Sequence, residues 1–309
     1  MMGYDSNTIS TPDPGDALTA SRYLTDLAAW IAAPYAELPG ARAGMVTGSA
    51  AKGLADYYSD LDMTMYYAET LPTDDTLAET RRRFGAAERK WLLGDPAEGS
   101  FAEAFDVNGI EVQIGHTTIA AWEAGIDQVL VELDCATPLQ KALEGTLACQ
   151  ALFGEALIHR WKERIAAYPP ELAQAMVRHN LRFFPLWALE THFRKWDATI
   201  WYYETLVEMC QHLVGVLAGL NRLYFTTFQF KRATRFIEEM SIRPRNLAPR
   251  LDALFRQELD QALPELKALV TETVMLVEAE MPDIDTEPVR SRLARRHAPW
   301  QPTQLRMDE

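Results

Sequence analysis

The chain has 309 residues, 48% of them apolar, which suffices for two domains with separate cores, and no apolar run is long enough to cross a membrane. Its formal net charge of −14 argues against a nucleic-acid substrate, which would need a basic face, and is compatible with a small cationic one. The 3 cysteines have no metal-binding spacing, which indicates free thiols in a reducing cytoplasm.

The N-terminal part of the chain is predicted to contain both helices and strands. Residues 1–15 have neither a basic start nor an apolar core, so we expect a disordered lead-in and no signal peptide. Apolar residues recur at helical spacing over 16–38, and a second helix is predicted over 73–93. Between them, short apolar or alternating segments predict strands over 43–47 and 60–67.

The first functional pattern follows the strand over 43–47. Gly48 and Ser49 stand where this strand turns into a short helical segment. Glycine lets a ligand approach the backbone closely, and a serine hydroxyl together with the N–H groups of a helix start attracts anions. The pair is therefore a candidate phosphate site. The alternative is an ordinary turn capped by serine.

A pair of carboxylates begins the next strand. Asp60 and Asp62 alternate with Leu61 and Met63, so the acidic side chains point from one face and the apolar ones from the other. Packing gains nothing from two like charges side by side, whereas hard oxygen ligands of this kind suit Mg²⁺. Asp60 and Asp62 are therefore candidate metal ligands. The alternative is a solvated, acidic strand end.

Two more strands are expected over 101–107 and 110–116, joined by a hairpin turn at Asn108 and Gly109. In the second of them the isoleucine and valine side chains share one face, and Glu111 points from the other. Taken alone, Glu111 is an ordinary solvent-facing strand residue. Beside the aspartate pair it becomes a candidate for the same site.

The order strand, Gly-Ser, short helix and strand with two aspartates resembles the signature of the DNA polymerase β-like nucleotidyltransferases. The closest resemblance is to bacterial aminoglycoside adenylyltransferases. It covers only a short part of the chain, the segments Gly48-Ser49 and Ser59-Asp60-Leu61-Asp62 with their spacer.

The resemblance implies transfer of a nucleoside monophosphate, AMP from ATP, to a hydroxyl group. It implies that Asp60 and Asp62 bind Mg²⁺ and that Gly48 and Ser49 hold the β- and γ-phosphates. In that family a third carboxylate comes from a later strand, which assigns Glu111 as a further metal ligand or as the base that takes the acceptor's proton.

Beyond Pro138 the sequence is predicted to be almost entirely helical. Pro185 should kink or split one of these helices, and the segment over 197–221 is apolar almost all round, as expected for the centre of a bundle. The predicted helices cover residues 139–148, 151–167, 171–195, 197–221, 228–240 and 247–280.

A basic cluster follows the most apolar helix. Asn221 and Lys231 are candidates for contacts to the triphosphate, because a positive charge there would offset charge on the leaving pyrophosphate. In related adenylyltransferases the helical domain supplies such contacts. The alternative, a solvated helix face around Lys231, is equally compatible with the spacing.

Together these features predict an α+β fold, with a small mixed β-sheet domain over 16–136, a helical bundle over 137–282 and a loose tail over 283–309. The predicted function is Mg²⁺-dependent nucleotidyl transfer in the cytoplasm, from a nucleoside triphosphate to a small cationic acceptor such as an aminoglycoside-like antibiotic. No nucleic-acid or membrane partner is expected. The alternative is a regulatory or toxin–antitoxin-type module of the same fold that modifies or binds a protein.

Overall fold

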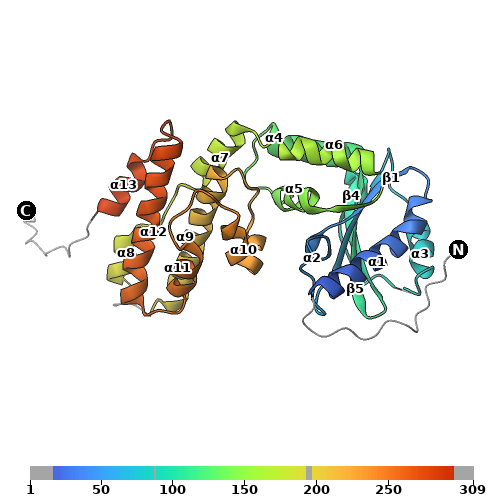
Figure 1. The fold of residues 1–309 in the computed structure, drawn as a ribbon, viewed down its shortest axis with the longest axis horizontal. Helices are drawn as coiled ribbons and strands as arrows, with labels where there is room; N and C mark the ends of the chain where they lie inside the picture. Colours follow the sequence, from blue (N-terminus) through green and yellow to red (C-terminus); the bar gives the residue numbers. More distant parts are fainter. Residues whose placement is uncertain (1–16, 87, 193–196, 296–309) are drawn as a thin grey trace, which may run out of the picture. The chain divides into compact units, whose positions relative to one another are not determined.

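A computed structural model of the chain describes residues 17–86, 88–192 and 197–295 (Figure 1). It divides into two compact units, Met1–Tyr168 and Pro169–Glu309. This division lies beyond the predicted boundary at 136/137. The reason is strand β6, Gln150–Phe153, which pairs with β1 and so ties the residues after 137 to the sheet of the first unit.

The first unit is built on a mixed six-stranded sheet with the order β3-β4-β5-β2-β1-β6. Strands β2 and β5 pair in parallel, and the other neighbours in this sheet pair antiparallel. The remaining strands are β1 (Ala41–Val46), β2 (Leu61–Tyr67), β3 (Trp91–Asp95), β4 (Ser100–Val107) and β5 (Ile110–Thr118). With the helices around it, this sheet confirms the predicted α+β class.

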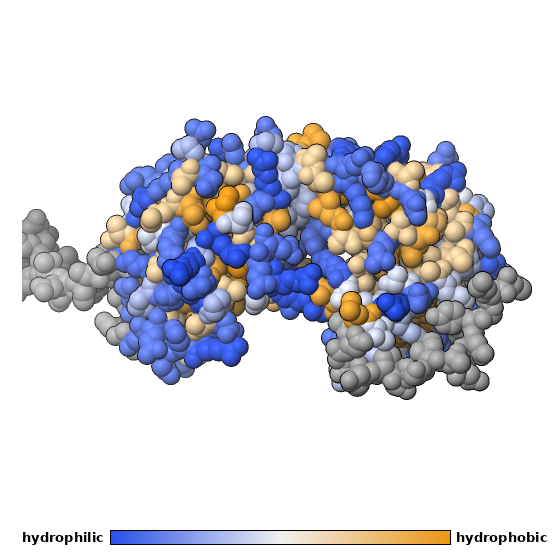
Figure 2. Space-filling view, in the orientation of Figure 1, coloured by the Kyte–Doolittle hydropathy of each residue, from blue (hydrophilic) through white to orange (hydrophobic). Residues whose placement is uncertain are grey.

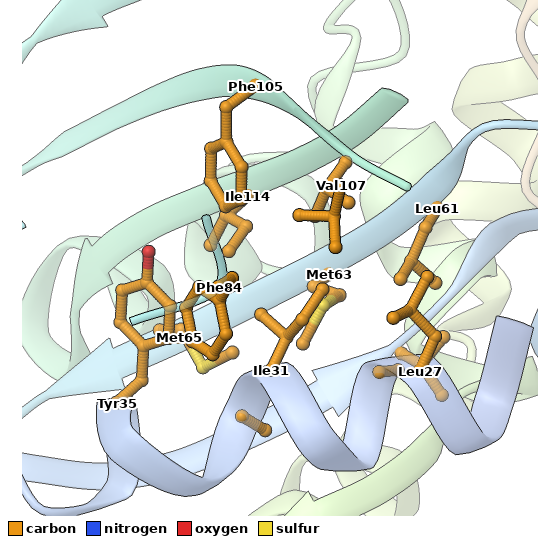
Figure 3. Close-up of a cluster of buried hydrophobic side chains, with 14 of the residues drawn as sticks. Leu27, Ile31, Tyr35, Leu61, Met63, Met65, Phe84, Phe105, Val107 and Ile114 are labelled. Atoms are coloured by element: carbon orange, nitrogen blue, oxygen red, sulfur yellow. The ribbon is translucent and has the colours of Figure 1, made fainter. Parts of the chain in front are cut away.

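Helices cover both faces of the sheet (Figure 1). On one face, Ile31 and Tyr35 of α1 point toward Met63 and Met65 of β2, all of them buried (Figure 3). On the opposite face, the ring of Tyr66 lies 4.6 Å from that of Trp161 on α6, centroid to centroid. The helices of this unit are α1 (Ala17–Ala36), α2 (Gly48–Ala51), α3 (Asp74–Arg82), α4 (Ile119–Leu130), α5 (Leu139–Ala148) and α6 (Glu155–Ala166), with a 3₁₀ turn at Pro96–Glu98.

Two predictions about local structure in this unit are confirmed and two are wrong. The hairpin turn at Asn108 and Gly109 joins β4 to β5, and β2 alternates as expected. The helix predicted over 73–93 ends at Arg82, because Gly85 turns the chain with a φ of +73° and the next segment pairs as β3 with β4. The predicted run of helices after Pro138 is interrupted by β6.

A buried ionic cluster lies between β4, β5 and α3. Glu103 is fully buried and pairs through one oxygen with Arg81 and, at 2.8 Å, with Arg89. Its other oxygen lies 3.4 Å from His116 Nε2, and His116 Nδ1 lies 3.0 Å from the Tyr67 hydroxyl. Burial by itself would raise the pKa of Glu103, but the interactions with His116 and the two guanidinium groups outweigh it and lower the pKa to about 2. Burial lowers the pKa of His116.

The second unit is helical, as predicted. Its most buried helix is α9 (Thr199–Leu220), and the chain breaks at Pro185 between α7 and α8, both as expected. The predicted helix over 247–280 is two helices that are separated after Leu254. The other elements are α7 (Pro170–Asn180), α8 (Leu186–His192), a 3₁₀ helix η2 (Thr227–Arg232), α10 (Ala233–Glu238), α11 (Leu247–Leu254), α12 (Leu259–Glu280) and α13 (Glu287–Ala294).

The C-terminal tail predicted over 283–309 is helical in its first part. Helix α13 buries Val289, and Arg290 pairs with Glu278 of α12, so this segment is docked and not loose. The remainder of the tail and the lead-in predicted over 1–15 lie outside the described residues.

Figure 2 shows hydrophilic residues over much of the visible face, with hydrophobic residues in scattered patches. Within the described ranges, no helix combines the length and apolar character that a membrane span requires.

Candidate active site

The turn after β1 brings Gly48 against Asp62. Strands β1 and β2 pair so that Val46 lies opposite Met63, and the N–H of Thr47 donates to the carbonyl oxygen of Asp62 at 2.9 Å. Gly48 has a φ of +64°, and a Cβ at this position would collide with Oδ2 of Asp62. Glycine is therefore required here both for its backbone conformation and for the space that the carboxylate occupies.

The chain after Gly48 forms the four-residue helix α2, which contains Ser49. Its N-cap residue Thr47 makes no capping hydrogen bond with its side chain. Because the first N–H groups of a helix have no intrahelical acceptor, this turn presents donors beside the Ser49 hydroxyl. Lys52, which ends α2, pairs with Glu144 of α5. The predicted phosphate site is thus a half-buried turn.

The two aspartates lie as the alternation predicted. Leu61 and Met63 are buried, 0% and 3% exposed, while Asp60 and Asp62 are only partly buried. The carboxylates therefore share the face opposite the α1 core, at the end of β2 where the strand begins. Together with Gly48, they form a single corner of the sheet.

Strand β5 adds an amide to this corner. In the parallel pairing of β2 with β5, Asp62 lies opposite Gln113. Gln113 Nε2 donates to Asp60 Oδ2 at 2.9 Å and to Glu111 Oε1 at 3.0 Å. The structure thus connects Glu111 to Asp60 through one side chain. Gln113 was not identified as a site residue from the sequence, although the two-residue period of the strand places it on the same face as Glu111.

Glu111 is also held from its other side. Lys90, just before β3, lies with Nζ 3.0 Å from Glu111 Oε2 and 2.9 Å from Asp106 Oδ1. The hydrogen bond from Lys90 is the main reason that the pKa of Glu111 falls below its ordinary value. Glu111 is therefore an ionised carboxylate with both oxygens engaged. Lys90 could not be identified as a partner of Glu111 from the sequence, because the segment before β3 was predicted to be helical.

The carboxylates fit Mg²⁺ as a pair. Mg²⁺ is usually bound through one or two carboxylates, with substrate phosphates and water as its other ligands. Asp60 and Asp62 can supply such a pair, and the Asp62 carboxylate lies directly against Gly48 of the β1–α2 turn. In the part of the chain that the structure describes, no three His, Cys, Asp or Glu side chains gather closely enough to hold a metal ion. The role of Glu111 as a third ligand therefore stays a prediction.

The candidate residues of the second unit already have contacts within it. The amide nitrogen of Asn221 donates to the carbonyls of Leu217 and Ile242, both at 2.8 Å, and its oxygen accepts from the N–H of Ile242 and from Ser241. A phosphate contact by this side chain would have to break those bonds. Lys231 is exposed on η2, above the ring of Phe228 at 5.4 Å, and its contact to a triphosphate stays a prediction.

Comparison with known proteins finds a distant structural similarity. No family model matches the chain, and no curated protein matches it. Among solved structures, the chain is similar to a nucleotidyltransferase-like protein from Exiguobacterium sibiricum, at 12% sequence identity over 86% of this chain and 80% of that one, with a TM-score of 0.36.

Proposed function

We propose that the chain is a nucleotidyltransferase that transfers a nucleoside monophosphate, AMP from ATP, to a hydroxyl group of a small molecule. One observation carries this proposal: Gly48 of the β1–α2 turn lies directly against the carboxylate of Asp62. A turn suited to phosphate and a pair of carboxylates suited to Mg²⁺ thereby meet at one point. Phosphoryl and nucleotidyl transfer require this combination, since the phosphates and the metal must be held together.

Each residue of the corner has a distinct task in this proposal. Gly48 and Ser49 hold the β- and γ-phosphates with N–H groups and a hydroxyl. Asp60 and Asp62 hold Mg²⁺, which when bound offsets the negative charge of the phosphates. The acceptor hydroxyl attacks the α-phosphorus, the bond to the bridging oxygen breaks, and pyrophosphate leaves. The hydroxyl proton passes to the carboxylate of Glu111.

The acceptor class follows from charge. The chain has a net charge of −14, and three of its carboxylates, those of Asp60, Asp62 and Glu111, belong to the corner. A negative site attracts cationic molecules and repels nucleic acids. We therefore propose a cationic, hydroxyl-bearing acceptor of the aminoglycoside type.

The experiment that tests the function is a screen of small hydroxyl-bearing cations with labelled ATP and Mg²⁺. The expected result is a labelled acceptor together with released pyrophosphate, and neither product from an Asp62→Asn variant. Label found in a protein and in none of the small molecules would favour the alternative, a module that modifies a protein partner. Absence of any transfer and of any ATP binding would overturn the proposal.

Replacing Ser49 with alanine is expected to weaken nucleotide binding. The change removes one hydroxyl from the phosphate turn, at a cost of about 1–3 kcal/mol if the group is desolvated when the nucleotide is bound. Calorimetry with Mg²⁺ and ATP measures the affinity, and steady-state kinetics measures KM. Ser100→Ala, at an exposed position at the start of β4, is the matched control. Equal affinity for Ser49→Ala and the wild type would contradict the assignment.

Replacing Glu111 with glutamine is expected to lower kcat by about 10²–10⁴-fold if the carboxylate is the base. The Glu111 side chain is only partly buried and faces away from the apolar side of β5, so replacing it opens no cavity. A base must be ionised, so the wild-type rate should fall only as pH drops through the lowered pKa of Glu111, and the variant should lack this limb of the pH–rate profile. A metal ligand would instead show a steeper Mg²⁺ requirement. If Glu111→Gln keeps the wild-type rate across both the pH titration and the Mg²⁺ titration, Glu111 is an ordinary strand residue.

A further inference from the structure

Gln113 occupies a central position among the charged groups of the corner. Its Nε2 lies 2.9 Å from Asp60 Oδ2 and 3.0 Å from Glu111 Oε1. A side-chain amide has two N–H donors, so each carboxylate receives one of them. The two acidic side chains, which come from adjacent strands, are therefore oriented by the same group.

The residue type at this position fits the task. Gln113 lies opposite Asp62 in the strand register, on the face that already carries Asp60 and Glu111. A further carboxylate at this position would add like charge and could not donate to its neighbours, whereas an apolar side chain would leave both carboxylates without this donor. Glutamine is the neutral residue of this length that donates two hydrogen bonds.

The contacts continue beyond Gln113. Lys90 holds the second oxygen of Glu111 at 3.0 Å, so Lys90, Glu111, Gln113 and Asp60 form one connected series of side chains. Such a series fixes the position of Asp60 relative to β5 as well as to its own strand. Groups that hold metal ligands in this way tune metal affinity without touching the metal.

We infer that Gln113 is a positioning residue of the active site, which orients Asp60 for the divalent cation and Glu111 for the acceptor through its two N–H groups. This inference rests on the proposed function. Gln113 makes no contact with substrate in this arrangement. Replacing it should therefore change the cation affinity and kcat, and leave unchanged the affinity for nucleotide measured without metal.

The test compares Gln113→Met with Gln128→Met. Methionine approximates the length of glutamine and cannot donate. Gln128, on α4, is a matched control in the same unit, because its Nε2 also donates to a carboxylate, Asp134 Oδ2, at 2.8 Å. Neither Gln128 nor Asp134 belongs to the corner. Calorimetry measures binding of Mg²⁺ in the presence of a non-hydrolysable ATP analogue, and turnover measures kcat and KM. Thermal unfolding of both variants measures any general loss of stability.

The expected result is a loss of about 10–100-fold in Mg²⁺ affinity or in kcat for Gln113→Met, which is typical for residues that hold metal ligands. Gln128→Met should match the wild type in both. In a Glu111→Gln background, Gln113→Met should cost less than in the wild type, because one of its two partners has already been changed. Wild-type Mg²⁺ affinity and kcat in Gln113→Met would overturn the inference alone. If the wild type binds neither Mg²⁺ nor the ATP analogue and shows no turnover, the proposed function and this inference are overturned together.

Discussion

An Asp62→Asn variant is expected to lose nucleotidyl transfer by roughly 10³-fold or more, since a bound metal supplies several kcal/mol of transition-state stabilisation and each 1.36 kcal/mol is tenfold in rate. The amide keeps the size of the carboxylate, so its contact with Gly48 is preserved in shape. In the proposed function, it removes a negative charge that would hold the cation. Asp60→Asn should have the same effect, because the proposed function assigns the cation to both side chains.

The unfolding temperature of both variants should stay at or above that of the wild type, because each change relieves repulsion between like charges and opens no cavity. Asp26→Asn, an exposed position on α1, serves as the control for loss of a carboxylate elsewhere in the unit. Transfer at the wild-type rate by either Asp60→Asn or Asp62→Asn would rule out the metal assignment. Loss of transfer with a collapsed melting temperature would show that the aspartates stabilise the fold instead.

A Glu103→Gln variant is expected to lose about 3–5 kcal/mol of unfolding free energy, the cost typical of removing one partner from a buried ion pair. Arg81 and Glu103 are 5% and 0% exposed, so water cannot replace the lost carboxylate. Arg89 loses its partner on the sheet as well. Denaturation in urea, followed by circular dichroism, measures the change.

The matched control is Glu37→Gln. Glu37 pairs with Arg83 in the same unit, but both side chains are largely exposed, 75% and 54%, and such pairs contribute only about 0–1 kcal/mol. Both variants lose one paired carboxylate, so the difference between their unfolding free energies measures the effect of burial. A Glu103→Gln protein that unfolds at the same urea concentration as Glu37→Gln would show that the buried cluster adds nothing to stability.

The same cluster should make the protein sensitive to acid. The folded-state pKa of Glu103 is lowered from 4.5 to about 2, so its contribution is complete above about pH 4.5 and is lost as pH falls toward 2. The pKa of His116 is also lowered in the folded state, so its protonation likewise destabilises the fold as the pH falls below the ordinary value of 6.5. The wild type should therefore lose stability over this window, and Glu103→Gln should lose less of it.

The sequence predicted those parts of the site that depend on local pattern. The alternation of Asp60 with Leu61 requires only the two-residue period of a strand, and the turn at Gly48 requires only the order of residues. Gln113 could not be recognised as a partner of Asp60, because their contact depends on which strand lies beside β2 and in which register. That information comes from the pairing of distant segments.

The errors in the fold have the same physical origin. Trp91 to Leu93 form an apolar run too short to distinguish strand from helix by period, and only pairing with β4 makes it a strand. Gln150–Phe153 became β6 because the edge of β1 was available. The buried partnership of Glu103 with Arg81 likewise joins a strand to a helix that the sequence could not bring together.

The parallel pairing of β2 with β5 also bears on how the protein folds. The β4–β5 hairpin connects neighbouring residues through a two-residue turn, and it can form with little loss of chain entropy. The pairing of β2 with β5 instead closes a long loop that contains α3, β3 and β4. Because non-local pairings form slowly, we expect Asp62 and Gln113 to meet late in folding, so that the proposed active site should be completed after most of the sheet has formed.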